Sequence, residues 1–190
     1  SAEARKEFLM RESQEYDMAA TYLKKIETQF PTSEYLKQSL LELADIYKGD
    51  YFQKEAYLEK VFDKFPQTPE AVYAGIELSK DYFSLKNYKK AVPIIEKMIK
   101  SWNVGEQYPE LELLLAIVYA GTDNYTQASF YLEKVEKKIP TVINSNPSYL
   151  FEAGRIHFQN RNYQQADAYL TKLINVFPTF TDIDEAAIIL

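Results

Sequence analysis

The chain of 190 residues contains no cysteine and a single histidine, His157. Without cysteine it can form neither a disulfide framework nor a thiolate nucleophile, and one histidine is too few for the usual zinc sites. Only five glycines are present, and none belongs to G-x-G-x-x-G or G-x-x-x-x-G-K-[ST], the loops that cradle phosphates. These absences exclude the common sequence patterns for thiol chemistry, zinc binding and nucleotide binding.

An excess of basic charge and long apolar runs are also missing. The net charge is −6, and lysine and glutamate are mixed along the whole chain. A nucleic-acid-binding protein would need a basic stripe, and an anionic membrane surface would attract a polybasic segment. No run of roughly 18 apolar residues is present to span a bilayer. We therefore expect no nucleic-acid partner and no direct insertion of this chain into a membrane.

What the chain does contain is one stretch that recurs five times. The clearest copy, residues 162–178, reads NYQQADAYLTKLINVFP, and four earlier stretches are variants of it. Their leading tyrosines are 35, 37, 37 and 38 residues apart: Tyr16, Tyr51, Tyr88, Tyr125 and Tyr163. A period in this range predicts a solenoid of stacked helical units. We call the five recurring stretches B helices and the segments between them A helices.

The B helices carry helix signals at both ends and along one face. Apolar residues at Tyr163, Ala166, Leu170 and Leu173 follow the spacing of one helical face. A short polar residue that can act as an N-cap precedes four of the tyrosines: Asp50, Asn87, Asn124 and Asn162. Proline, which cannot continue a helix, closes four of the five stretches: Pro31, Pro66, Pro140 and Pro178. Inside one B helix, Pro93 predicts a bend.

The A helices share a small residue three positions before an aromatic one. The pairs are Ala44 and Tyr47, Ser79 and Tyr82, Ala116 and Tyr119, and Gly154 and His157. The small residue allows two helices to approach closely, and the aromatic ring fills the space beside it. His157 is therefore expected to be a core residue rather than a general base.

Three A helices are expected to begin at a proline: Pro69, Pro109 and Pro147. Asp182, Asp184 and Glu185 lack the spacing of an EF-hand loop and are expected to cap a further helix.

These A-helix and B-helix patterns resemble the tetratricopeptide repeat (TPR) over nearly the whole chain, although Lys54 and Trp102 depart from it. The resemblance implies an all-α fold, a right-handed superhelical solenoid of antiparallel helix pairs, with about five pairs. We expect one array over residues 1–190, with residues 2–13 as the first A helix. The approximate repeats are residues 1–31, 32–66, 67–103, 104–140 and 141–178, and residues 179–190 begin a further helix. Because that last stretch is apolar, we expect the chain to be a fragment of a longer protein.

The resemblance also implies where a partner would bind, since TPR arrays line a concave groove with their A helices. Alternating apolar and basic side chains there would suit an amphipathic helix or an extended peptide, with Lys80 and Arg155 contacting its acidic groups. We expect no catalytic residue, no metal and no cofactor. The residues expected on the concave face are Tyr73, Ile76, Lys80, Phe83, Leu113, Ile117, Phe151, Arg155 and Phe158.

A narrower resemblance concerns the B-helix ends QFPTS, KFPQT and VFPTF. They look like repeats of bacterial envelope TPR proteins, which include the lipoprotein of the outer-membrane β-barrel assembly machinery and the coordinator that binds TolA. This resemblance implies the periplasm or cell envelope, and the cytoplasm is the alternative.

The leading hypothesis is a non-enzymatic scaffold that holds a partner protein or peptide in the groove, within a bacterial envelope assembly. A second hypothesis is a structural spacer that self-associates through its apolar end, Ala186 to Leu190. A third is an accessory domain of a larger enzyme.

Overall fold

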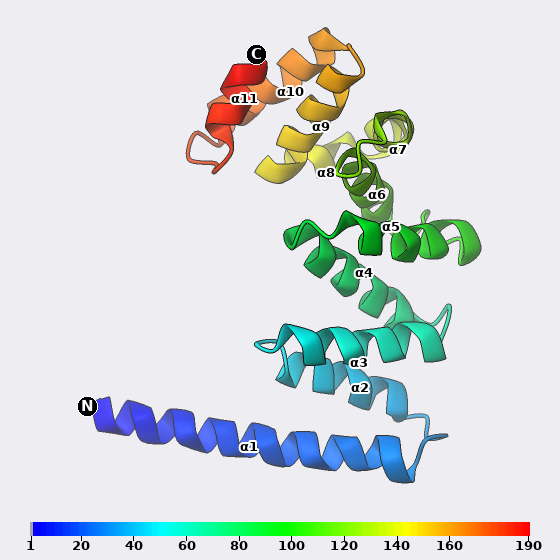
Figure 1. The fold of residues 1–190 in the computed structure, drawn as a ribbon, viewed down its shortest axis with the longest axis vertical. Helices are drawn as coiled ribbons and strands as arrows, with labels where there is room; N and C mark the ends of the chain where they lie inside the picture. Colours follow the sequence, from blue (N-terminus) through cyan, green and yellow to red (C-terminus); the bar gives the residue numbers. More distant parts are fainter. Residues whose placement is uncertain (1) are drawn as a thin grey trace. The chain divides into compact units, whose positions relative to one another are not determined.

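The computed structural model describes the backbone of residues 2–190 and the side chains of residues 13–190. Over that backbone the chain forms eleven α-helices and one π-helical turn, η1, without a β-strand (Figure 1). The expected all-α fold of antiparallel helix pairs is confirmed. The chain divides into two compact units, residues 1–78 and residues 79–190. None of the helices in the described range combines the length and apolar character needed to cross a membrane.

Unit 1 contains α1 (Ala2–Gln29), α2 (Leu36–Ile46), α3 (Tyr51–Lys64) and the start of α4 (Pro69–Ser84). Helix α2 packs against both α1 and α3. Its Leu40 and Leu43 are fully buried, as is Val61 of α3, so the predicted apolar faces of an A helix and a B helix meet here. Both α1 and α3 end just before an expected proline.

The prediction of a helix pair at the start of the chain is wrong. Residues 1–31 were expected to hold an A helix over residues 2–13 and a B helix after it, but α1 is one continuous helix of 28 residues. The segment MRESQEY, residues 10–16, contains no glycine or proline, and most of its residues favour the helix. Nothing in the sequence therefore forces a turn at the expected boundary.

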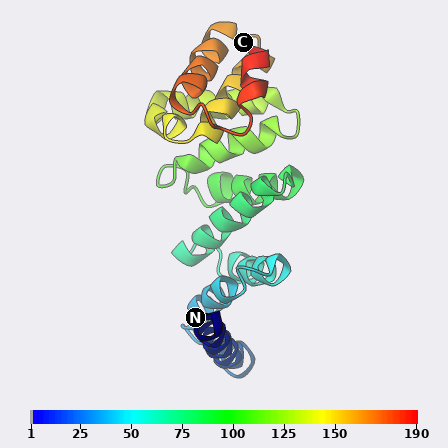
Figure 2. The same cartoon turned by 90° about the vertical axis from the view of Figure 1, so that its left-hand side faces the viewer.

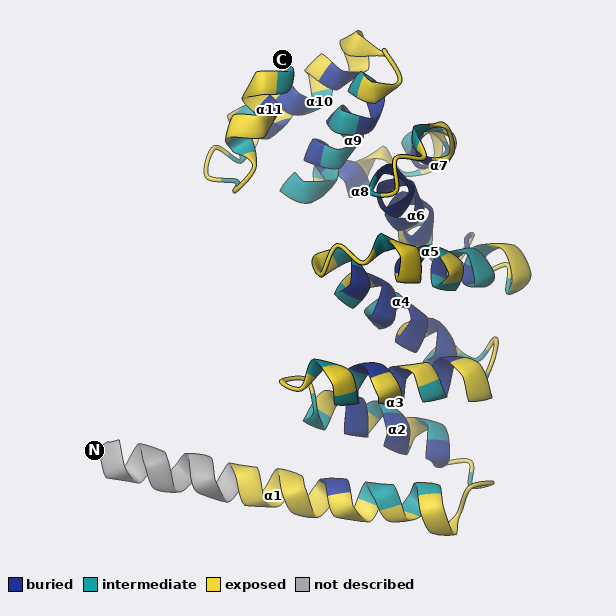
Figure 3. Cartoon of the chain, viewed as in Figure 1, coloured by how far each residue is buried: buried dark blue, intermediate teal, exposed yellow. Residues whose placement is uncertain are grey.

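Unit 2 contains the end of α4 and all later elements. These are α5 (Tyr88–Glu96), η1 (Lys97–Ser101), α6 (Glu110–Ala120), α7 (Tyr125–Lys138), α8 (Pro140–Asn144), α9 (Pro147–Gln159), α10 (Tyr163–Val176) and α11 (Ile183–Ile189). Every residue of α6 from 111 to 120 is buried, so this helix is dark over almost its full length in Figure 3. Helix α11 lies beside α10 in both views (Figures 1 and 2).

Two prolines change the pattern of the array. Pro93 lies inside α5 and cannot donate a backbone hydrogen bond, and α5 gives way to the π-helical turn η1 one turn later. Pro140 follows the end of α7, as expected, but it also begins the short extra helix α8. The extra residues of this repeat, relative to the usual TPR period, are thus partly helical.

The turns from A helices to B helices share a backbone conformation. The residue before the asparagine cap has a positive φ angle at Lys86 (55°), Asp123 (60°) and Arg161 (61°). Side-chain capping is confirmed at two of the four expected positions. Asp50 accepts a hydrogen bond from the backbone N–H of Gln53 at 3.2 Å, and Asn124 accepts one from that of Gln127 at 3.3 Å. Asn87 and Asn162 make no such capping bond.

Candidate functional site

Unit 2 contains a pocket of about 320 Å³, which we call the α9 pocket. The end of α4, the start of α5, the first turns of α9 and the segment around the start of α11 surround it. Its volume lies at the lower end of the range of roughly 300–1,000 Å³ that is usual for ligand sites. The lining residues are Phe83, Ser84, Lys86, Tyr88, Ser148, Phe151, Glu152, Arg155, Phe180, Asp182 and Glu185.

Aromatic rings form the apolar part of this pocket. Phe83 lies 6.1 Å from Tyr88, centroid to centroid, and Phe151 lies 6.0 Å from Phe180. Both pairs are tilted, within the range of favourable ring contacts. Phe151 belongs largely to the core, since only 6% of it is exposed. The pocket therefore has aromatic surface supplied by α4, α5, α9 and the α10–α11 connection.

An ion pair on α9 forms part of the polar lining. Arg155 donates to Glu152 Oε2 from Nη2 at 2.6 Å and from Nε at 2.9 Å. Its Nη1 also donates to the hydroxyl of Tyr125, the first residue of α7, at 3.4 Å. The two side chains are only 22% and 13% exposed. The charge of Arg155 is thus compensated within the chain.

The other charges around the pocket are mostly acidic. Burial raises the pKa of the Glu152 carboxyl. The positive charge of Arg155 lowers that pKa, but not enough to cancel the rise, and the negative charges of Glu185 and Asp182 raise it further. Burial also raises the pKa of the Tyr88 hydroxyl, with a further contribution from Glu152. Together with Lys86 and Arg155, the three carboxylates give the lining a small net negative charge.

Three of the expected partner-binding residues, Phe83, Phe151 and Arg155, come together in the α9 pocket. Leu113 and Ile117 are each only 1% exposed, because α6 packs against α5, α7 and α9 and leaves no open face.

The remaining expected residues lie elsewhere. Phe158 packs edge-on against Tyr163 at 5.6 Å and is not part of the pocket lining, and Lys80 is exposed on α4. In unit 1, Tyr73 is 54% exposed and lines a separate pocket of about 250 Å³, while Ile76 is half-buried.

The sequence interpretation missed several pocket residues. Tyr88 had been assigned to the supporting B helices, and Asp182 to a helix cap. Asp182 does occupy the N-cap position of α11, but its side chain makes no capping hydrogen bond and lines the pocket instead. Glu152 could have been found from its spacing, since it lies three residues before Arg155 on the same helical face.

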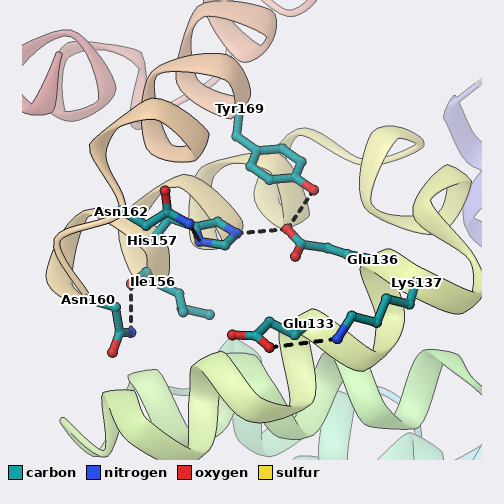
Figure 4. Close-up of polar contacts among 8 residues, drawn as sticks. All are labelled: Glu133, Glu136, Lys137, Ile156, His157, Asn160, Asn162 and Tyr169. Atoms are coloured by element: carbon teal, nitrogen blue, oxygen red, sulfur yellow. Dashed lines mark hydrogen bonds and ion pairs between the residues drawn. The ribbon is translucent and has the colours of Figure 1, made fainter.

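His157 is a core residue, as expected, and belongs to a polar cluster (Figure 4). It is 3% exposed, and its Nε2 lies 2.7 Å from Glu136 Oε1, which also accepts a hydrogen bond from the Tyr169 hydroxyl at 2.8 Å. The side-chain amide of Asn162 lies 3.4 Å from the other ring nitrogen. Each polar group of the imidazole thus has a structural partner, and the cluster joins α7, α9 and α10.

The same arrangement recurs along the array. The A-helix aromatic ring stacks on a B-helix tyrosine in three hairpins: Tyr47 on Tyr57 at 5.8 Å, Tyr119 on Tyr131 at 5.9 Å, and His157 on Tyr169 at 5.7 Å. In each case the polar atom of the A-helix ring bonds to the preceding B helix, through Lys24, Glu96 and Glu136 respectively. These contacts tie each hairpin to its neighbour.

In the described part of the chain, acidic residues and His157 form no cluster of three or more that could hold a metal ion.

Two family models match parts of the sequence. The model of an outer membrane lipoprotein family, YfiO, matches residues 6–76. A tetratricopeptide-repeat model matches residues 148–179, which contain α9 and α10. No curated protein matches the sequence.

Solved structures show the same fold at low sequence identity. MamA from Desulfovibrio magneticus RS-1 superposes with a TM-score of 0.62 at 17% identity, over 92% of this chain and 96% of that structure. BtubC from P. vanneervenii superposes with a TM-score of 0.57 at 13% identity, over 96% of this chain and 81% of that one. The recurring hairpins and these matches agree on a TPR-like helical solenoid, and residues 148–179 match the tetratricopeptide-repeat model itself.

Proposed function

We propose that the chain is a non-catalytic scaffold that binds a segment of a partner protein, and that the α9 pocket receives side chains of that segment. The observation that carries the proposal is the meeting of Phe83, Phe151 and Phe180 with the Arg155–Glu152 pair in one pocket. Aromatic pockets of this kind bury the apolar anchors that supply most of the affinity of an interface.

The charges define the partner further. Asp182 and Glu185 favour a basic residue beside the apolar anchor, since opposite charges across an interface steer and select the partner. Arg155 is held by Glu152 and Tyr125, so we assign it the role of shaping the pocket rather than of binding an acidic group. The proposed ligand is therefore an apolar–basic segment of a protein.

We place this interaction in a bacterial envelope assembly, with the periplasm as the compartment. The match of residues 6–76 to an outer membrane lipoprotein family supports this setting. Fractionation of the source cells tests it independently of the pocket: recovery of the protein in the cytoplasm alone would contradict the envelope assignment.

Site-specific photo-crosslinking tests the pocket. A photoreactive phenylalanine replaces Phe83 or Phe180, both pocket residues, and replaces Phe130 of α7 as a matched control that is 52% exposed and is not part of the lining. We expect positions 83 and 180 to crosslink to one partner segment and position 130 not to do so. The double variant Asp182→Lys/Glu185→Lys should weaken binding of that segment by about tenfold. Equal crosslinking at all three positions would sink the assignment.

Self-association is a second candidate function, favoured by the exposed apolar side chains of Ile188 (84%) in α11 and of Leu190 (52%) directly after it. Sedimentation velocity over a range of concentrations tests it. A concentration-dependent dimer that Ile188→Glu abolishes would support this candidate, and a monomer at every concentration would contradict it.

A further inference from the structure

One face of α1 lacks the packing that the equivalent face of the other B helices has. In α3, α7 and α10 the tyrosine six residues after the first tyrosine stacks on the A helix of its own hairpin, as described for Tyr57, Tyr131 and Tyr169. Tyr57 and Tyr131 are 8% and 5% exposed. Tyr22 stands at the same register in α1 and is 62% exposed.

The neighbours of Tyr22 differ from their equivalents in the same way. Leu23 and Ile26 are half-buried, whereas Leu58 and Val61 at the same positions of α3 are 2% and 0% exposed. Met18, one turn before Tyr22, is 60% exposed. Figure 3 accordingly shows much of the described surface of α1 as exposed. We call Met18, Tyr22, Leu23 and Ile26 the open face of α1.

Within unit 1, no described helix packs on this face, although the Lys25 ammonium lies 5.0 Å from the centroid of the Tyr22 ring. Helix α2 packs on another side of α1, where Ala20 is 3% exposed and Lys24 donates to the hydroxyl of Tyr47 at 2.7 Å. In the later hairpins a turn precedes the first tyrosine of the B helix and brings its A helix alongside. Helix α1 instead continues back to Ala2 without a turn, so residues 2–15 do not fold back onto it.

We propose that the open face of α1 binds an amphipathic α-helix of a partner protein that carries the large–small–x–x–aromatic pattern of the A helices. The interface that this helix would form is already present three times in the chain. The small residue would allow close approach to Leu23 and Ile26, and the aromatic ring would stack on Tyr22. Asp17 and Lys25 border a shallow pocket of about 260 Å³ beside Met18 and Tyr22, so polar groups flank the apolar stripe.

A second copy of the chain fits the open face less well. Helices α2, α6 and α9 each pack between two B helices and would have to leave their own hairpins. Helix α11 is more open, but its seven residues, IDEAAII, contain no aromatic residue to stack on Tyr22. We therefore favour a helix of a different protein over these helices of a second copy.

Fluorescence anisotropy with a labelled peptide tests this surface. The probe is LKQSLLELADIYK, residues 36–48, which contains Leu43, Ala44 and Tyr47 in the required pattern. We expect saturable binding to the intact chain, weakened by about tenfold or more in Tyr22→Glu. The matched control is Tyr35→Glu, since Tyr35 is 67% exposed and lies outside the open face; it should bind as the unchanged chain does. A probe with Tyr47→Ala should bind more weakly than the original peptide.

Absence of saturable binding, or equal weakening by both protein variants, would overturn the proposal. Two further measurements distinguish a partner helix from two other occupants of the open face, namely another part of the chain itself and a second copy of the chain. Tyr22→Glu should leave the melting temperature unchanged; a loss typical of a core substitution would mean that the chain covers the face itself. A dimer in sedimentation that Tyr22→Glu abolishes would place a second copy there, and either result refutes the partner helix. Because the open face belongs to unit 1 and the α9 pocket to unit 2, each proposal can fail without the other.

Discussion

Gly154 of α9 lies so close to Leu170 of α10 that a β-carbon on residue 154 would stand 2.6 Å from Leu170 Cδ2. Leu170 is completely buried, so it has no solvent-filled space into which to move. The other A helices have Ala44, Ser79 and Ala116 at this position, each at most 3% exposed. The small residue of the A-helix pattern is thus required by the distance between the paired helices.

Gly154→Ala should therefore destabilise the protein by about 1–3 kcal/mol, because overpacking outweighs the better helix propensity of alanine. Urea unfolding measures the difference. Gly49→Ala is the matched control, since a β-carbon there meets nothing within 4 Å. A Gly154→Ala protein as stable as the control would show that α9 and α10 separate without cost.

Arg161→Gly should raise the free energy of unfolding by about 1 kcal/mol, because residue 161 has a φ of 61° and glycine adopts this conformation without the steric penalty of a β-carbon. Arg161→Ala removes the same side chain but keeps the penalty, so it should give no such gain. Thermal unfolding compares the two variants. Equal stability would mean that the left-handed turn before α10 carries no strain.

Glu136→Gln should lower stability at neutral pH by about 1–2 kcal/mol, since the Glu136 carboxylate accepts hydrogen bonds from both His157 and Tyr169. Burial raises the pKa of this carboxyl, but the hydrogen bonds from His157 and Tyr169 outweigh burial, so the folded pKa lies below the ordinary value. The contribution of the carboxylate is therefore present above the unfolded pKa of about 4.3 and is lost as the pH falls through the folded pKa.

Denaturant unfolding between neutral and acidic pH checks this sign. The stability difference between the unchanged protein and Glu136→Gln should shrink once the pH falls below about 4.3. A difference that stays constant over the whole range would show that the ionisation of Glu136 does not contribute.

Arg155→Met should be tolerated better in acid than at neutral pH. The substitution leaves the Glu152 carboxylate poorly compensated, and burial already raises the pKa of that carboxyl. A raised folded pKa means that the native state takes up a proton before the unfolded state does, so stability increases as the pH falls through the folded pKa. Glu152→Gln should lower the free energy of unfolding by about 2 kcal/mol. The double variant Arg155→Met/Glu152→Gln should recover part of that lost stability. Strict additivity of the two single variants would refute direct coupling of the pair.

The sequence predicted the elements that repeat. The period, the apolar faces and most helix ends could be read from it because each hairpin solves the same packing problem with the same residue types. His157 is one example: Tyr47 and Tyr119 at equivalent places predicted a core residue, and the structure shows all three rings stacked on B-helix tyrosines.

The sequence was less informative where the repeats differ. Helix α1 is continuous because no glycine or proline interrupts it before Tyr16. The repeat pattern predicted a turn there, so this absence was not taken into account. The burial of Leu113 and Ile117 depends on neighbours on every side of α6, which one helical face cannot reveal. The α9 pocket combines residues from positions 83 to 185, so its composition follows from tertiary packing rather than from any local pattern.

The burial of α6 on every side has a consequence for the timing of local opening in unit 2. A helix without a solvent-facing side cannot fray residue by residue at its centre, because each of its turns is held by the helices around it. Its amide protons should exchange with deuterium only when the unit opens as a whole, whereas the exposed helix α11 exchanges through small local fluctuations. The slowest-exchanging amides of unit 2 should thus lie in α6, and their rate would report the global stability of that unit.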